Sequence, residues 1–153
     1  MAAHILLAVL AALLLTAAVT DLRGRVIANS LNLAIALLAP AFWWATGLSL
    51  WPDVALQLAL GLAVFAAFAG LFALGWMGGG DVKLLGALAL WLPAALVLKM
   101  LVLMSLIGGV LTLGYVAAHR LRKLKESPEI PYGVAIVGAA LSVISEPYLN
   151  HFS

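Results

Sequence analysis

Four long stretches without a charged residue limit what this chain can fold into. They cover residues 1–20, 26–52, 54–80 and 100–119. Each is near or above the ~20 residues that cross a bilayer as a helix. Only 9% of the residues are charged and 66% are hydrophobic, whereas soluble domains have about 25% charged residues. The sequence therefore predicts an all-α polytopic membrane protein and excludes a soluble globule.

The charge and cysteine counts exclude several classes of function. The formal net charge of +2 is too small for a basic nucleic-acid surface, so we expect no nucleic-acid partner. The sequence has no cysteine, which rules out a thiolate metal site and a cysteine nucleophile. His4, His119 and His151 are predicted to lie far apart in the topology. We therefore expect no metal ion and no cofactor.

The apolar pattern and its interruptions predict six crossings. Residues 82–119 would form one helix of about 57 Å, nearly twice a ~30 Å hydrocarbon core. This stretch is expected to fold back near Pro93, because proline suits the first turn of a new helix. A fourth helix of only about 11 residues would then need tilt, local thinning or a re-entrant path. The other helices are predicted at about 1–20, 31–46, 54–76, 94–118 and 132–148.

The basic residues orient these helices. Lys and Arg stay on the cytoplasmic side, and Arg23 and Arg25 directly follow the first helix. The N-terminus is therefore predicted outside, and with six crossings only Lys99 of the eight Lys and Arg falls outside. We interpret the basic run from Arg120 to Lys125 as a topology anchor rather than a substrate-docking patch. Residues 1–153 are expected to form a single domain.

The same topology places several aromatic and acidic side chains. Tryptophan prefers the membrane–water interface. The predicted outer group is Trp43, Trp44, Trp51 and Trp91, and Trp76 is predicted at the inner interface. Asp53 and Glu146 are expected outside as solvated loop residues.

Two aspartates fall at the cytoplasmic ends of predicted helices. Asp21 ends the first helix and Asp81 follows the third, so both carboxylates are expected at the same membrane face, where they could meet. Acidic residues near hydrocarbon are costly and often mark a function. The alternative is that each one caps a helix or pairs with a nearby Arg or Lys.

A glycine run beside the second aspartate favours a catalytic role over a purely structural one. The sequence reads Gly78-Gly79-Gly80-Asp81-Val82-Lys83. Three glycines allow another backbone or a substrate strand to approach closely, although they also suit a flexible turn. Two aspartates at hydrogen-bonding distance share a proton and provide an acid and a base in one unit. Such a pair can activate water against a peptide carbonyl, as in aspartic proteases.

These residues resemble the prepilin peptidases, membrane aspartic proteases of the GxGD type. The resemblance rests on Asp21 with arginines after it, on Asn29, and on Gly78-x-Gly80-Asp81 closing with Lys83. The short length, the tight fourth and fifth helices, and the run Ile130-Pro131-Tyr132-Gly133 look most like the small form that serves tight-adherence (Flp) type IV pili.

The resemblance implies a function and a site. It implies that Asp21 and Asp81 are the catalytic pair, and that Gly78, Gly80, Lys83 and Asn29 belong to the motif and the substrate approach. The implied substrate is a prepilin whose basic leader is removed after a glycine, at the cytoplasmic side of the bacterial inner membrane.

Two departures from the family pattern qualify this implication. The family commonly has Ile-Pro-Asn where this chain has Ile27-Ala28-Asn29. Larger relatives carry a cytoplasmic domain with paired cysteines and N-methylate the trimmed pilin, so cleavage without methylation is expected here. Two alternatives stay open: a non-catalytic protein such as a proton-coupled carrier or pilus assembly factor, and a protein that binds prepilin without cutting it.

Overall fold

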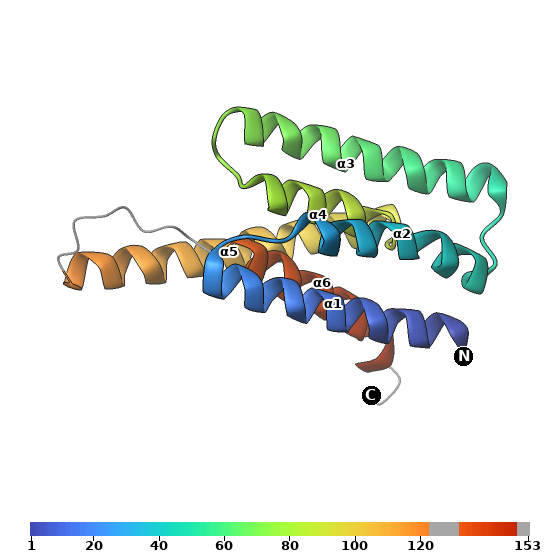
Figure 1. The fold of residues 1–153 in the computed structure, drawn as a ribbon, viewed down its shortest axis with the longest axis horizontal. Helices are drawn as coiled ribbons and strands as arrows, with labels where there is room; N and C mark the ends of the chain where they lie inside the picture. The colour runs from blue at the N-terminus through green and yellow to red at the C-terminus, as the bar shows by residue number, and fades with distance from the viewer. Residues whose placement is uncertain (123–131, 150–153) are drawn as a thin grey trace.

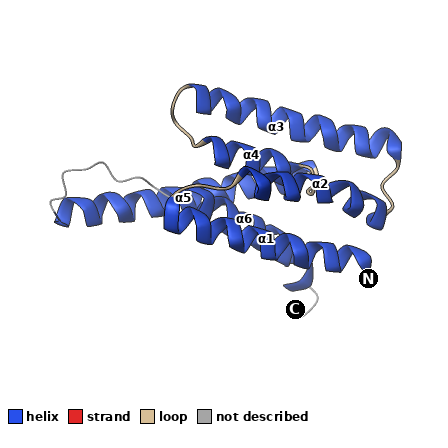
Figure 2. Ribbon diagram, viewed as in Figure 1, coloured by secondary structure: helices blue, strands red, loops and turns tan. Residues whose placement is uncertain are grey.

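A bundle of six α-helices forms the part of the chain that the structure describes. The structure is a computed structural model that describes residues 1–122 and 132–149, with side chains for 1–118 and 132–146. No strand occurs in these ranges (Figure 2), which confirms the all-α prediction. The helices are α1 (Ala2–Gly24), α2 (Asn29–Thr46), α3 (Ala55–Ala73), α4 (Gly79–Ala89), α5 (Ala94–Arg122) and α6 (Tyr132–Leu149), with a short turn η1 (Leu50–Val54) before α3.

Some of the sequence predictions concern residues or side chains outside the described ranges. These are the basic run from Arg120 to Lys125, Ile130 and Pro131, His119 and His151.

The helices alternate in direction along the bundle (Figure 1). One end of the bundle therefore gathers the last turns of α1 and α3 and the first turns of α2, α4 and α6. Three segments are long and apolar enough to span a membrane: Ala2–Gly24, Leu50–Ala73 and Ala94–Ala118. In the most apolar 18-residue stretch of each, only 17%, 11% and 22% of the residues are buried. Most of their apolar side chains therefore face outward, as lipid contact requires. The chain is therefore a polytopic membrane protein, as predicted.

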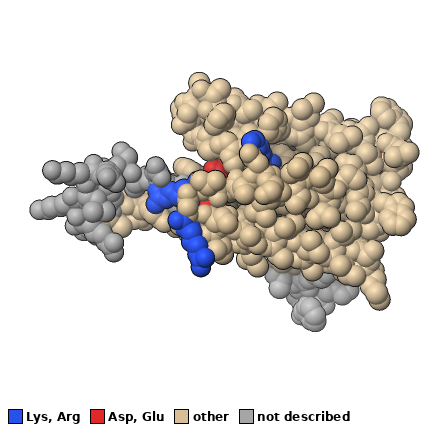
Figure 3. Space-filling view, viewed as in Figure 1, with Lys and Arg blue, Asp and Glu red and all other residues tan. Residues whose placement is uncertain are grey.

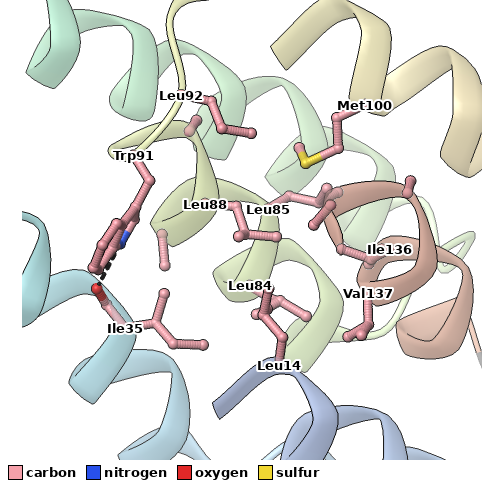
Figure 4. Packing of buried hydrophobic residues seen from close by; sticks show 14 of the residues in the cluster. Leu14, Ile35, Leu84, Leu85, Leu88, Trp91, Leu92, Met100, Ile136 and Val137 are labelled. Carbon is pink, nitrogen blue, oxygen red and sulfur yellow. Dashed lines mark hydrogen bonds between the residues drawn. The ribbon is translucent and has the colours of Figure 1, made fainter. Parts of the chain in front are cut away.

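The two central helices are α4 and α6. α4 packs on α2, α3 and α6, and α6 packs on α1 and α5 as well. Figure 4 shows leucines of α4 meeting Leu14 of α1, Ile35 of α2 and Ile136 of α6. Every α4 residue from Leu84 to Ala89 is buried. A short helix that is apolar on all sides is expected to lie inside a bundle.

The short fourth helix ends inside the protein. α4 has 11 residues, about 16 Å at 1.5 Å per residue and half of a ~30 Å core. The carbonyls at its end need donors, because hydrocarbon supplies none. Gln57 of α3 donates from Nε2 to the oxygens of Ala89 at 2.6 Å and Leu92 at 2.7 Å, and Trp43 of α2 donates from Nε1 to Leu90 at 2.7 Å. Side chains of α2 and α3 thus replace the missing water.

The interfacial prediction is wrong for two of the tryptophans. Trp43 and Trp91 are buried. Trp91 donates from Nε1 to the Ile35 oxygen at 2.9 Å (Figure 4). Both indoles are buried because their N–H groups donate hydrogen bonds to backbone carbonyls inside the bundle. The exposed tryptophans are Trp44, Trp51 and Trp76, and their interfacial position stays a prediction.

The prediction for Glu146 also needs correction. Glu146 belongs to α6 and forms an ion pair with Lys99 of α5, so it joins two helices instead of being solvated in a loop. Asp53 is exposed, and its carboxylate accepts hydrogen bonds from the Ser49 N–H at 3.0 Å and the Ser49 hydroxyl at 2.8 Å. These bonds hold the turn that leads into α3.

Removing the donor at the end of α4 is expected to destabilise the bundle. Gln57→Leu leaves two carbonyls without their side-chain donor, which costs roughly 2 kcal/mol or more. Thermal melting in detergent, followed by helical circular dichroism, measures this loss. Ser142→Ala is the control, because that hydroxyl bonds only within its own helix. Equal melting of the two variants would contradict a capping role for Gln57.

Candidate active site

The first aspartate of the predicted pair lies where α1 meets α6. Asp21 is in the last turn of α1 and only 5% exposed. Its Oδ2 accepts a hydrogen bond from the Val134 N–H at 3.3 Å, and the Gly133 backbone also bonds this carboxylate. Both donors belong to the first turn of α6. The carboxylate therefore faces the positive end of a helix, where an anion is stabilised.

This contact requires glycine at position 133. A Cβ on Gly133 would lie 2.7 Å from Asp21 Oδ2, 2.8 Å from its Cγ and 2.9 Å from Ile27 Cδ1. Sequence reasoning quoted Gly133 only as part of a family-like run and gave it no role. The one available signal was a glycine near the start of an apolar helix, which costs stability and so needs a reason.

The second aspartate lies in the first turn of α4, beside the glycine run. The Asp81 carboxylate lies close to the Gly78 backbone at the start of α4, where the positive end of a helix stabilises an anion. A Cβ on Gly78 would lie 3.0 Å from Asp81 Oδ2. A Cβ on Gly80 would lie 3.2 Å from Ile27 Cβ and 3.4 Å from the Ile27 oxygen. Because these glycines have no side chains, the Asp81 carboxylate and the loop that contains Ile27 can lie close to their backbone. The glycine run was predicted to allow such a close approach.

The two aspartates share one end of the bundle. Ile27 lies next to both sites, because a Cβ added to Gly80 or to Gly133 would meet atoms of Ile27. The charge of Asp21 acts electrostatically on Asp81. Figure 3 shows acidic atoms at this end in small patches flanked by basic side chains. The arrangement brings together two carboxylates that can divide acid and base roles between them.

The remaining motif residues connect α2 to α4. Lys83 donates from Nζ to Asn29 Oδ1 at 2.7 Å, and both side chains are exposed. Asn32, which is buried, donates from Nδ2 to the Gly80 oxygen at 3.1 Å. Sequence reasoning did not single out Asn32, because a lone asparagine in an apolar helix has no motif partner. These bonds fix the glycine run against the first turns of α2.

The site offers no evident metal-binding cluster within the described ranges. There, no three His, Cys, Asp or Glu side chains gather in a way that could hold a metal ion.

Comparison with known proteins identifies the family. The model of the type IV leader peptidase family matches residues 8–113. This range contains both aspartates, Asn29 and the glycine run, and it ends before α6 and Gly133. No curated protein and no solved structure matches the chain. The match covers well over half of the sequence and confirms the resemblance to prepilin peptidases, so the chain belongs to the type IV leader peptidase family.

Proposed function

We propose that residues 1–153 form one aspartic peptidase domain that removes the basic leader from Flp-like type IV prepilins. Cleavage takes place at the cytoplasmic face of the bacterial inner membrane, and the product is not N-methylated. Family membership supports the leader-peptidase activity, and the membrane-length helices support the membrane location.

The observation that carries this proposal is the position of the two aspartates. Asp21 is buried against the first turn of α6, and Asp81 lies in the first turn of α4 at the same end of the bundle. A proton-coupled carrier is expected to hold its ionisable groups near the bilayer midplane. These carboxylates lie at helix ends, which suits a bond that is cut near the membrane surface.

The chemistry follows from two carboxyl groups and one water molecule. The ionised aspartate takes a proton from water as the water oxygen bonds to the peptide carbon, and the protonated aspartate gives its proton to the carbonyl oxygen. The aspartate that took the proton of water then gives it to the amide nitrogen as the C–N bond breaks, and the other aspartate takes a proton from a hydroxyl of the tetrahedral intermediate, which restores the pair. The leader leaves with a new carboxyl group and the pilin with a new amine.

Co-expression with a candidate prepilin tests this function. We expect the wild-type chain to yield a pilin that has lost its leader and bears an unmethylated amine, measured by intact mass spectrometry. The matched control is the Asp21→Asn, Asp81→Asn double variant at the same membrane level, with which the leader stays attached. If the wild type leaves every candidate intact, the protein is a binder or a carrier, and proton flux in proteoliposomes separates these two.

A further inference from the structure

Asn32 differs from the other buried residues of α2. Those residues are Ile35, Ala39 and Trp43, whereas Asn32 carries an amide and is only 4% exposed. Its Nδ2 donates to the Gly80 oxygen, but its Oδ1 has no hydrogen-bond partner within the part of the chain that the structure describes. A buried acceptor without a partner lowers stability. The presence of an amide at this position therefore points to a role beyond stability.

The bond from Asn32 reaches the residue that directly precedes Asp81. Gly80 lies in the first turn of α4, within the glycine run 78–80, which has no side chains to pack against its neighbours. The position of this turn therefore depends on contacts to its backbone. Asn32 supplies one of them, at 3.1 Å. Ile27 supplies another, because a Cβ on Gly80 would lie 3.2 Å from Ile27 Cβ.

The separation of the two aspartates depends on how α1 and α4 are held. Asp21 belongs to α1 and Asp81 to α4, and both helices pack on α2 and α6. The Asp21 carboxylate is fixed to α6 by the Val134 N–H. The bond from Asn32 to Gly80 fixes the start of α4 to α2. Two carboxylates that act on one water molecule must keep a set geometry, so both contacts bear on the reaction.

From these contacts we infer that Asn32 is a positioning residue: it holds Gly80, and through Gly80 it sets where the Asp81 carboxylate lies relative to Asp21. This inference rests on the proposed function and adds a residue that acts on the reaction without touching the substrate. A leucine would fill a similar space, but it would not fix the direction of the Gly80 carbonyl, because van der Waals packing lacks the directionality of a hydrogen bond.

Replacing Asn32 by leucine tests this role through kinetics and stability together. Asn32→Leu is expected to lower kcat for leader cleavage by at least about 10-fold and to keep KM within about twofold, because the aspartates shift while the substrate still binds. Its melting temperature is expected to equal or exceed that of the wild type. The Gly80 carbonyl lies inside α4 and keeps the N–H four residues later, and the Oδ1 without a partner is gone.

The bond at the opposite end of α4 provides a matched control. Trp43 of α2 also donates to a carbonyl of this region, that of Leu90, but at the end away from the aspartates. Trp43→Phe removes that donor and is expected to melt at a lower temperature than the wild type. Because the start of α4 is untouched, it is expected to keep the wild-type kcat well below its melting temperature.

Thiol cross-linking compares the separation of the two positions without a substrate. The chain has no cysteine, so Asp21→Cys combined with Asp81→Cys places a single reactive pair at the carboxylate positions. A short bifunctional thiol reagent joins the two sulfur atoms only while both lie within its reach. Adding Asn32→Leu is expected to slow this cross-linking by at least about threefold, because the start of α4 is no longer held. Adding Trp43→Phe is expected to leave the cross-linking rate unchanged.

The possible results separate the positioning role from the proposed function. If the wild type cleaves and Asn32→Leu keeps its kcat, the positioning role is overturned and the peptidase stands. If Asn32→Leu melts at a lower temperature and its folded fraction turns over at the wild-type kcat, the bond is merely structural and the role is likewise overturned. If the wild type cuts no precursor, the proposed function fails, and the cross-linking rates alone decide whether Asn32 sets the separation of the two positions.

Discussion

Replacing either aspartate of the pair by asparagine is expected to lower the rate of leader cleavage by at least about 1,000-fold. Asparagine keeps the shape of the side chain but can neither accept the proton of water nor return it. Asp21→Asn also keeps an oxygen for the N–H groups of Gly133 and Val134, so we expect the variant to fold. Initial rates on purified enzyme in detergent, at equal concentration, measure the loss.

A third aspartate provides the control for this prediction. Asp53 is exposed and bonds Ser49 in the turn before α3, so Asp53→Asn is expected to retain the wild-type rate within about twofold. The double variant of Asp21 and Asp81 is expected to be no slower than the slower single variant, because residues that act as one unit are not additive. Near-normal cleavage by either single variant would rule out the two-aspartate mechanism.

Adding one methyl group at Gly133 is expected to have the second largest effect. In Gly133→Ala the new Cβ would lie 2.7 Å from Asp21 Oδ2, so the carboxylate or α6 must move. A displacement of about 1 Å in a catalytic site can cost about 100-fold in rate. Overpacking also costs about 1–3 kcal/mol of stability. Cleavage rates and thermal melts of the same preparation measure the two effects separately.

Another glycine of α6 controls for the change in helix propensity. A Cβ on Gly138 would meet Ile107 Cδ1 at 3.6 Å, an ordinary contact, so Gly138→Ala is expected to keep both rate and stability. Adding Ile27→Val to Gly133→Ala removes the Cδ1 that would lie 2.9 Å from the new methyl. This change should restore part of the stability and little of the rate, because the clash with Asp21 persists. Wild-type activity of Gly133→Ala would show that Asp21 is not positioned through this contact.

Much of the fold could be predicted from the sequence because lipid imposes simple demands. A membrane-spanning segment must be long, uncharged and helical, and these requirements are visible in the printed sequence. The break near Pro93 was predictable for the same reason, since 82–119 is too long for one crossing. The structure has α4 ending at Ala89 and α5 beginning at Ala94, as this reasoning predicts.

The site was only half predictable. Asp21, Asp81 and the glycine run were visible because they interrupt apolar segments or depart from average composition. Gly133 and Gln57 were missed because their roles depend on contacts across 112 and 32 positions of the chain, to Asp21 and Ala89. The error at Trp91 has the same origin, because nothing local reveals that its indole serves a carbonyl of α2.

The contact between Asp21 and Val134 also bears on the order in which the protein is made. The two residues are 113 positions apart, and ribosomes add about 5–20 residues per second. On the order of ten seconds therefore pass between synthesis of the carboxylate and synthesis of its backbone donors. In the later part of that interval, after Asp81 has been made, both aspartates exist but the first lacks its anchor. A chain that stops before its last helix would carry the family motif without a finished site, so incomplete translation products should not cut precursors.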